Sequence, residues 1–586
     1  MTDNSAPAIL SLERLRASLA DAGLTLDLDG VVTQREAAAA AVRQIDDYIR
    51  PRLADLDAPL LAVVGGSTGS GKSTIVNALL GVATTRAGVI RPTTRQPILV
   101  HAPVDAGWFA SDRILPGLAR VRGHISAPGT PASSAGDAPE ESRIGELMLL
   151  EHESVPRSLA IIDAPDIDSV ADENRALATQ LLAAADLWLF VTTANRYADA
   201  VPWRLLESAA ARSITVGIVL NRVPPGAVDE VLPDLRDMLA ERGLPDAPVF
   251  TIDEQQLDEL GMLPASTVDG PRAWLEGIAS DREARARIAA RTLSGAISDL
   301  DRHVSLIADA RQQQIDWLDS AHAATTAHYE TAIKAVDEAT QNGALMRGEV
   351  LARWQDFVGT SDFFRKVDSW FSRTRDKATA WLTGKPSPVV EVETQIETGL
   401  QAVIVDQAGR AAAAAWADLE RSTPGRSIAE QHPSLSRESP ELLQATTAMI
   451  REWQGALMQL IHDNAGNKRI RARVLSLGLN VVTVALMIVV FASTGGLTGG
   501  EIAIAGGSAV LGQKLLETVF GEDAVRHLAS EARLDLQERV RTLFDAEVAR
   551  LDLAMEPLRF GANPESLRRE SQVLIADVAR AAGTNS

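Results

Sequence analysis

Short apolar runs alternate with segments of mixed polarity from about residue 60 to residue 253 of the chain. The runs cover residues 60–64, 97–100, 159–162, 187–192, 214–220 and 249–252. Each run has the length of a buried strand, and the segments between them are long enough for helices. We therefore predict a doubly wound, mainly parallel α/β sheet, preceded by a helix over the alanine-rich residues 34–53.

The pattern changes after about residue 271, where strand-like runs end and helix-favouring composition takes over. Apolar residues with 4-3-4-3 spacing follow at Leu293, Ile297, Leu300, Val304 and Ile307. This spacing predicts an apolar seam of the coiled-coil type, which we expect to lie in a helical core, with assembly between chains as the alternative. Breaks at residues 384–388 and 423–440 divide the region, so we predict a long helical stalk or bundle over residues 270–473.

Residues 474–500 contain no charged residue. The first 19 of them would form a helix of roughly 28 Å, which is about the thickness of the hydrocarbon core of a bilayer. A second uncharged run covers residues 502–513, and four cations precede the first: Lys468, Arg469, Arg471 and Arg473. We predict a membrane hairpin over residues 474–520 and a helix over residues 521–586 that returns to the stalk. The alternative is a core helix of a large bundle.

Composition and charge narrow the possible functions. The 586 residues carry 57 basic and 78 acidic side chains, a formal charge of −21, so we expect no general nucleic-acid partner. There is no cysteine, which excludes disulfides and metal-thiolate sites. The first residues lack the pattern of a secretory signal. Residues 363–385 are locally basic and aromatic, which is typical of a lipid surface or, equally, of stalk packing or self-assembly.

The strongest chemical pattern is a phosphate-binding loop. It follows the first predicted strand, opens a predicted helix, and matches G-x-x-x-x-G-K-S/T. Its glycines allow backbone N–H groups to converge on phosphate oxygens, Lys72 adds a positive charge, and the Ser73 hydroxyl is a ligand for Mg²⁺. The predicted nucleotide-binding residues here are Gly66, Ser67, Thr68, Gly69, Ser70, Gly71, Lys72, Ser73 and Thr74.

Two further residues are candidates for the metal. Asp163 ends the predicted strand LAIID. A carboxylate at this position would hold the water shell of Mg²⁺. Alternatively, Asp163 only helps to form the turn that follows the strand. Thr93 and Thr94 lie in IRPTTRQP, where a threonine hydroxyl would join the Mg²⁺ shell and the threonine N–H would contact the γ-phosphate. We therefore predict Lys72, Asp163 and one of these threonines as catalytic, with Ser73 as a third metal ligand. Arg91 and Arg95 beside Thr94 would add charge in the transition state, or are simply solvated.

The order of these motifs resembles that of the dynamin superfamily, particularly of bacterial dynamin-like proteins. The motifs are GGSTGSGKSTIVNALLG, PTTRQP, DAPDIDS and VGIVLNRVP, within about residues 60–255. The resemblance implies a P-loop GTPase domain over residues 58–256 that takes GTP and Mg²⁺, after an N-terminal helical segment over residues 1–57. It assigns the switch roles to Thr94 and Asp163, so the resemblance identifies Thr94 as the threonine predicted to be catalytic and to bind the metal. It assigns the base-reading position to Asn221 and Arg222.

Three residues depart from the family pattern. Asp166 stands where D-x-x-G has glycine, which places a carboxylate near the polyphosphate. The base-reading motif becomes N-R-V-P, without the carboxylate that recognises guanine, so ATP is not excluded as the ligand. Thr68 occupies the position of a water-positioning glutamine, so hydrolysis is expected to be slow or differently assisted.

The sequence therefore favours a membrane-associated dynamin-like GTPase on the cytoplasmic side of the cell membrane. Its expected partners are lipids and a second copy of itself or another dynamin-like chain. The resulting process would be membrane remodelling, tethering or protection. Two alternatives stay open, a P-loop ATPase or kinase-like protein, and a nucleotide-binding membrane scaffold with little hydrolysis.

Overall fold

The structure is a computed structural model that divides into two compact units. It describes residues 6–82, 96–123, 145–168, 172–259, 261–341, 388–466, 468–492 and 506–583. Unit 1 comprises Met1–Leu24, Gly30–Gln313 and Gly561–Ser586, and unit 2 comprises Thr25–Asp29 and Gln314–Phe560. The segments predicted as a basic aromatic surface (residues 363–385) and as the hairpin turn (residues 493–501) lie outside the described residues.

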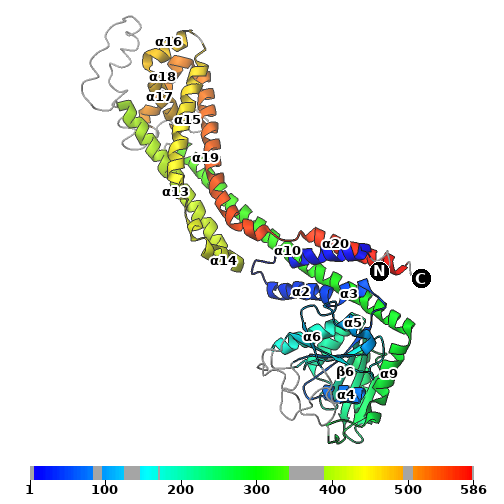
Figure 1. Ribbon diagram of the computed structural model, residues 1–586. Coiled ribbons are helices and arrows are strands. Elements are labelled where there is room, and N and C mark those ends of the chain that lie inside the picture. The colour runs from blue at the N-terminus through cyan, green and yellow to red at the C-terminus, as the bar shows by residue number, and fades with distance from the viewer. Residues whose placement is uncertain are drawn as a thin grey trace. The chain divides into compact units, whose positions relative to one another are not determined.

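Unit 1 contains a sheet of eight strands in the order β3-β4-β2-β5-β1-β6-β7-β8 (Figure 1). The strands are β1 Leu60–Gly66, β2 Ile98–His101, β3 Ala119–Arg122, β4 Glu146–Glu151, β5 Leu159–Asp163, β6 Leu187–Thr193, β7 Thr215–Val223 and β8 Val249–Asp253. All neighbouring strands run parallel except β2 and β5. The prediction of a mainly parallel α/β sheet is confirmed, and β3 and β4 are two strands that the apolar runs did not indicate.

Helices cover both faces of this sheet because successive residues of β1 point to opposite sides. Leu61 and Val63 belong to a core with Leu181 of α6, whereas Val64 belongs to a second core with Val76 of α4. The helices here are α4 Lys72–Leu80, α5 Ala106–Phe109, α6 Asp172–Ala183, α7 Ala200–Ala211, α8 Val228–Glu241 and α9 Asp269–Ser280, with short turns η2 Pro103–Asp105 and η4 Ala265–Val268. The sheet is therefore buried on both faces, as a parallel sheet requires.

A helical core also belongs to unit 1. It joins α1 Ala6–Ala20, α2 Val31–Gln44, η1 Ile45–Ile49, α3 Arg50–Ala54, the first part of α10 Arg282–Gln341, and α20 Pro564–Gly583. The five seam residues from Leu293 to Ile307 are all buried in this cluster, together with Leu12 of α1 and Leu567 of α20. The seam is thus packed against helices of the same chain.

A buried ion pair connects the helical core to the sheet. Arg52 of α3 pairs with Asp186 directly before β6, and neither side chain is exposed to more than a few per cent. Asp186 also accepts hydrogen bonds from the Tyr48 hydroxyl and the Leu61 N–H, each at 2.9 Å. Because a buried charge is stable only when it is paired and hydrogen-bonded, this cluster holds the two layers in one arrangement.

We expect Asp47→Asn to stabilise the protein at neutral pH. Burial raises the pKa of Asp47 to about 6, although the side-chain hydrogen bond from Gln180 opposes this effect. Burying the charged form therefore costs about 3 kcal/mol above pH 6, and this cost disappears as pH falls towards 4. Urea unfolding of the full chain should show the variant more stable at pH 7.5 and equal to wild type near pH 4. Asp229→Asn on the surface of α8 is the control, and parallel pH profiles for Asp47→Asn and wild type would refute the assignment.

Unit 2 is a bundle of long helices (Figure 1). It contains the rest of α10, α13 Pro388–Glu420, α14 Thr423–Gln431, η6 Pro433–Ser436, α15 Leu442–Asn464, α16 Lys468–Leu477, α17 Leu479–Ala492, α18 Gly506–Phe520 and α19 Glu522–Arg559. Trp453 of α15 is fully buried at its centre, where its indole N–H donates to the Ala532 carbonyl at 3.0 Å. The prediction of a long helical region after the sheet domain is confirmed.

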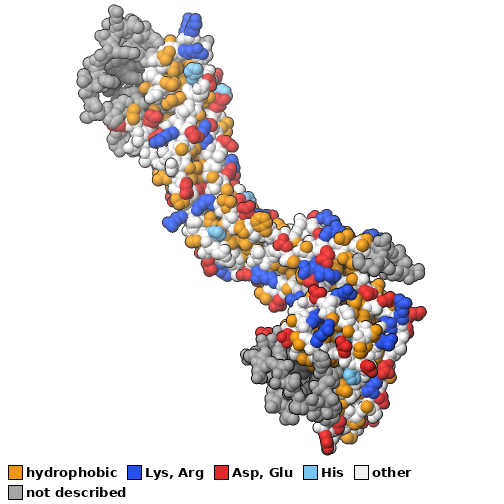
Figure 2. All heavy atoms as spheres, in the orientation of Figure 1, with side chains coloured by type: hydrophobic (Ala, Val, Ile, Leu, Met, Phe, Trp, Pro, Cys, Tyr) orange, Lys and Arg blue, Asp and Glu red, His pale blue; other side chains and the backbone are white. Residues whose placement is uncertain are grey.

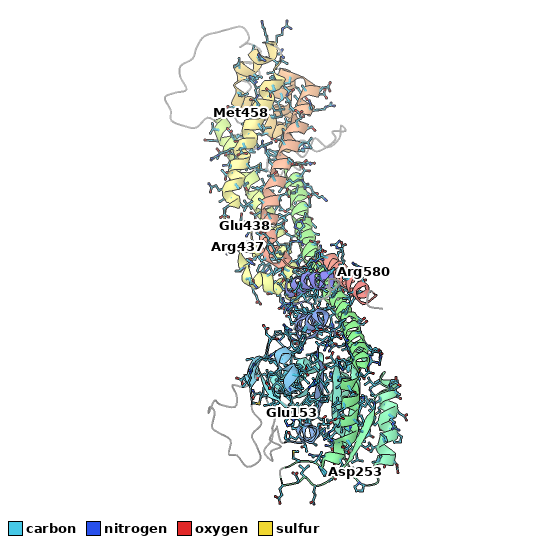
Figure 3. The ribbon with its side chains drawn as sticks, turned by 45° about the vertical axis from the view of Figure 1, so that its right-hand side comes forward. Glu153, Asp253, Arg437, Glu438, Met458 and Arg580 are labelled. Carbon is cyan, nitrogen blue, oxygen red and sulfur yellow. The ribbon has the colours of Figure 1, made fainter. Side chains whose placement is uncertain are left out.

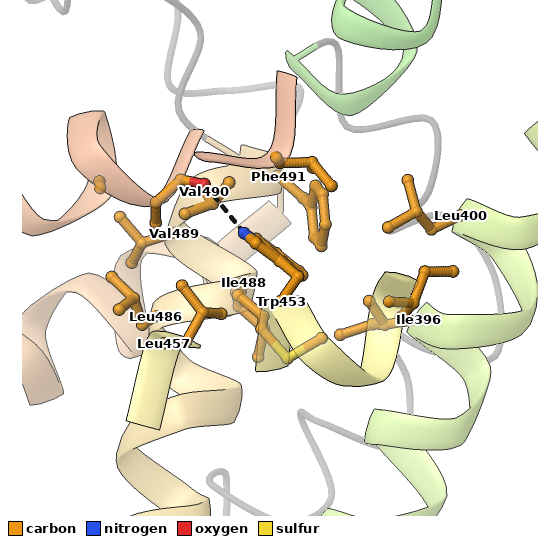
Figure 4. Close-up of a cluster of buried hydrophobic side chains, with 14 of the residues drawn as sticks. Ile396, Leu400, Trp453, Leu457, Leu486, Ile488, Val489, Val490 and Phe491 are labelled. Carbon is orange, nitrogen blue, oxygen red and sulfur yellow. Dashed lines mark hydrogen bonds between the residues drawn. The ribbon is translucent and has the colours of Figure 1, made fainter. Parts of the chain in front are cut away.

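The uncharged segment α17 lies inside this bundle. Residues from Val484 to Phe491 are each at most 7% exposed, and Figure 4 shows several of them around Trp453 with Ile396 and Leu400 of α13. Within the described residues, no single helix is long and apolar enough to cross a membrane. In the same part of the chain, one bent pair of helices, Lys468–Leu475 and Leu479–Phe491, has the length and composition of a membrane span, and its two arms meet at 95°.

Candidate functional site

The candidate site lies where four parallel strands end. β1, β5, β6 and β7 run in the same direction, so Gly66, Asp163, Thr193 and Val223 all lie at the carboxyl edge of the sheet. Asp253, the last residue of β8, marks the same edge in Figure 3. Ligands of open α/β sheets bind at this edge, because loops there bring residues from distant parts of the chain together.

The loop between β1 and α4 depends on two glycines. A Cβ atom on Gly66 would lie only 2.0 Å from the Val191 carbonyl oxygen, so no larger residue fits. Gly71 has a φ of +94°, which favours glycine, and α4 begins directly after it at Lys72. The N–H groups at the start of α4 therefore lie at the end of the loop, which is the arrangement that anion binding requires.

Several buried polar atoms beside this loop lack a hydrogen-bond partner within the described residues. They are the hydroxyl oxygens of Ser67, Ser70 and Thr192 and both carboxylate oxygens of Asp163. Buried polar atoms are almost always paired in folded proteins, so a cluster of unpaired ones needs an explanation. A polar, charged ligand held by the loop would supply the missing partners.

Asp163 and Ser73 are suited to hold Mg²⁺ beside such a ligand. Burial raises the pKa of Asp163 to about 6, and the nearby Ser73 hydroxyl and Lys72 ammonium oppose this effect. Oxygen ligands of this kind are what Mg²⁺ prefers, and the bound cation would itself favour the ionised carboxylate.

Lys72 is buried and already has two partners. Its ammonium group donates to the Ser67 carbonyl oxygen at 3.1 Å and forms an ion pair with Asp166. Asp166 is the residue that replaces glycine in the family pattern. The structure therefore places this carboxylate directly on the predicted phosphate-binding lysine.

The sequence patterns missed two residues at the site. Asp168 accepts hydrogen bonds from the Thr68 N–H at 2.6 Å and from the Thr68 hydroxyl at 2.8 Å. Arg196, in the loop after β6, donates to Asp168 at 2.6 Å and to the Thr68 carbonyl at 3.0 Å. Burial alone would raise the pKa of Asp168. The hydrogen bonds from Thr68 and the positive charge of Arg196 outweigh this effect, so the pKa of Asp168 is lowered. The position of Arg196 directly after a neighbouring parallel strand was the available signal.

Asn221 also contacts the phosphate-binding loop. It is buried at the end of β7, donates to the Ser70 carbonyl at 2.8 Å, and accepts from the Arg222 N–H at 2.9 Å. Arg222 is solvent-exposed and has a φ of +54°, which is unusual for a residue other than glycine. Both residues therefore lie beside the loop, and their contact with a nucleotide base stays a prediction.

The remaining predicted residues are placed only in part. Thr74 lies in the first turn of α4, next to Ser73. Thr94, with Arg91 and Arg95, lies outside the described residues. The site as described therefore joins the phosphate-binding loop to Asp163, Asp166, Asp168, Arg196 and Asn221.

The sheet topology, the loop and the strand-final aspartate together define an α/β domain of the P-loop nucleotide-binding class. Residues 61–222 match the model of the Dynamin family. The resemblance to the dynamin superfamily that the motifs predict is therefore confirmed over this segment. The match begins within β1 and ends at Arg222, so it covers every candidate residue described above.

Among curated proteins, no match is found. Two similar solved structures come from an oligomerised bacterial dynamin pair described as providing a mechanism for long-range sensing and tethering of membranes. Each is 11% identical and covers 95% of this chain and 96% of its own, with TM-scores of 0.40 and 0.38. A third, the LeoA bacterial dynamin GTPase from ETEC, is 12% identical, covers 99% and 97%, and has a TM-score of 0.22. The likeness to the Dynamin family rests on the sequence match of residues 61–222 alone.

Proposed function

We propose that this protein is a dynamin-like GTPase that couples the binding and hydrolysis of Mg-GTP to the remodelling, tethering or protection of a membrane. The observation that carries the chemical part is the phosphate-binding loop with buried Lys72 and the unpaired oxygens of Asp163, inside a dynamin-family domain. Bound Mg²⁺ would neutralise charge on the phosphates. Ser73 and Asp163 would hold the cation, Lys72 would orient the phosphates, and Thr94 would complete the site.

The lipid part of the proposal is supported by the surface of α16. Lys468, Arg469 and Arg471 are exposed there, and Leu475 of the same helix is 81% exposed. Figure 2 shows basic side chains at the α16 end of unit 2. A helix with exposed cations and an exposed leucine suits the surface of an anionic membrane, which we propose to be the cytoplasmic face. Insertion of residues 474–520 as a hairpin would require α17 to leave its core.

Turnover measured with and without lipid tests both parts together. Full-length protein should hydrolyse GTP with Mg²⁺, and vesicles of equal parts phosphatidylglycerol and phosphatidylcholine should bind it and change the rate. Because N-R-V-P lacks the carboxylate that recognises guanine, competition between ATP and GTP tests which nucleotide the protein prefers. Strong preference for ATP would favour the ATPase or kinase-like alternative, and binding without turnover would favour the scaffold.

We expect reversal of the α16 charges to weaken vesicle binding. Each cation near an anionic surface contributes about 1 kcal/mol, so the double variant Lys468→Glu, Arg469→Glu should lose at least roughly tenfold in vesicle affinity. Arg451→Glu, on the exposed face of α15, is the matched control and should bind as wild type does. Co-sedimentation with anionic vesicles measures the effect. Equal binding by all three proteins would remove α16 from the proposal.

A partner chain is part of the same proposal. The dynamin-family domain leads us to expect that the protein acts as a homo-oligomer or pairs with another dynamin-like chain. Light scattering of the full-length protein, with and without GTP and Mg²⁺, tests this expectation. A monomer under every condition would refute it.

A further inference from the structure

The phosphate-binding lysine has an anionic partner within the protein. Lys72 is 5% exposed, and its ammonium group pairs with the Asp166 carboxylate as well as with the Ser67 carbonyl. The Asp166 side chain is itself 23% exposed, so it approaches the lysine from the solvent side. A nucleotide phosphate would have to reach Lys72 from that side too.

Asp166 does not reach the lysine as a free surface side chain, because the residues after it are anchored to the loop. The Ile167 N–H donates to the Gly66 carbonyl at 3.4 Å, and the Ile167 side chain is buried. Asp168 then binds the N–H and the hydroxyl of Thr68. Two successive residues thus hold the Asp166 carboxylate against the phosphate-binding loop.

Arg196 strengthens this anchor. Its guanidinium bridges the Asp168 carboxylate and the Thr68 carbonyl, and it also pairs with Asp199 at 2.8 Å. Charge-assisted hydrogen bonds of this kind are stronger than neutral ones. The segment after β5 is therefore attached to the loop at both the backbone and the side-chain level.

A carboxylate and a phosphate cannot both occupy the space around one buried ammonium without strong repulsion. The pairing in the structure therefore has a direct consequence for binding. Any ligand that places a phosphate on Lys72 must first separate the lysine from Asp166. The free energy of that separation is subtracted from the affinity of the ligand.

We propose that Asp166 is an internal competitor for the phosphate site, which holds Lys72 in the nucleotide-free protein and sets the affinity for nucleotide. This inference rests on the proposed nucleotide binding. It assigns control of the affinity for nucleotide to the position at which the family pattern has glycine.

Calorimetric titration of the full-length chain with GTP and Mg²⁺ tests this role. Asp166→Asn and Asp166→Gly both remove the charge but differ in shape, and each should bind GTP at least tenfold more tightly than wild type. Asp234→Asn is the matched control, because this carboxylate is on α8 and bonds the Tyr197 hydroxyl instead of the lysine. It should change the affinity by less than twofold.

Thermal unfolding separates competition from a merely structural role. Without nucleotide, both variants should melt below wild type, because the buried ammonium of Lys72 then loses the carboxylate with which it forms an ion pair. Saturating GTP should raise their melting temperature by more than it raises that of wild type. A structural role alone would lower stability without increasing affinity.

The possible results distinguish this inference from the function on which it rests. Tighter binding by both variants, with the control unchanged, supports the competitor role, as does binding that appears only in the variants. Binding by wild type with equal or weaker binding by the folded variants overturns the inference alone. Absence of binding by wild type and variants overturns nucleotide binding, and the inference with it.

Discussion

Lys72→Met is expected to weaken the binding of GTP with Mg²⁺ by at least roughly a hundredfold and to reduce hydrolysis to background. Lys72 is the cation buried at the start of α4, and a charge-assisted contact with phosphate in a buried site contributes several times more than a surface ion pair. Methionine keeps the unbranched shape and most of the length of the lysine side chain but provides no charge and no hydrogen-bond donor. Titration calorimetry measures the affinity, and phosphate release measures turnover.

A matched control for this variant is available in the same chain. Lys334→Met makes the same substitution at an exposed position of α10 and should bind and hydrolyse GTP as wild type does. The melting temperature of Lys72→Met without nucleotide checks its fold. A folded Lys72→Met protein that binds GTP within threefold of wild type would contradict the site as a whole.

The phosphate-binding loop could be predicted from the sequence because the spacing of its glycines follows directly from the backbone geometry of the loop. Glycine at 66 is required by the Val191 carbonyl, and glycine at 71 by a positive φ, so the pattern and the fold impose the same residues. The strands β1, β5, β6 and β7 could be predicted for a similar reason. Each is nearly completely buried and therefore nearly continuously apolar.

The edge of the sheet was harder to predict. β3 reads ARVR, and none of its residues is fully buried, so its apolar signal is weak. The antiparallel pairing of β2 with β5 also leaves no trace in the sequence, because an apolar run has no direction. Both features depend on which strands become neighbours, and this is decided by the whole fold.

The contacts of Asp166, Asp168 and Arg196 could not be predicted from spacing either. Thr68 and Asp168 are 100 positions apart, and Asp168 and Arg196 are 28 apart. A motif specifies which residue types are required. It does not specify which acidic residue forms an ion pair with the lysine when the ligand is absent. The departure at Asp166 was visible as an anomaly, and only the structure shows its ion pair with Lys72.

Ile488→Asp is expected to destabilise unit 2 by more than about 4 kcal/mol in the absence of lipid. Ile488 is fully buried in α17, and a carboxylate placed there would lose the water that stabilises its charge. Gly512 of α18 lies close to this side chain, since a Cβ atom on it would be in ordinary contact, at 3.4 Å, with an Ile488 methyl group. Urea unfolding of the full-length chain measures the loss.

Leu475→Asp provides the matched comparison. It makes the same chemical change three residues before the bend at Gly478, but on a side chain that is 81% exposed. We expect its stability to lie within about 0.5 kcal/mol of wild type, because a surface substitution removes little packing. Its binding to anionic vesicles should nevertheless fall, since the exposed leucine is the apolar contact that α16 offers to lipid.

The two variants together distinguish a core helix from a lipid-facing one. Composition cannot do so, because an apolar helix satisfies the requirements of a protein core and of a bilayer equally well. If α17 is part of the core, Ile488→Asp lowers stability in buffer and vesicles do not restore it. If α17 instead works in lipid, Ile488→Asp keeps the stability of wild type in buffer and loses vesicle binding. In that case α17 would be the membrane element, and the lipid contact proposed for α16 would become secondary.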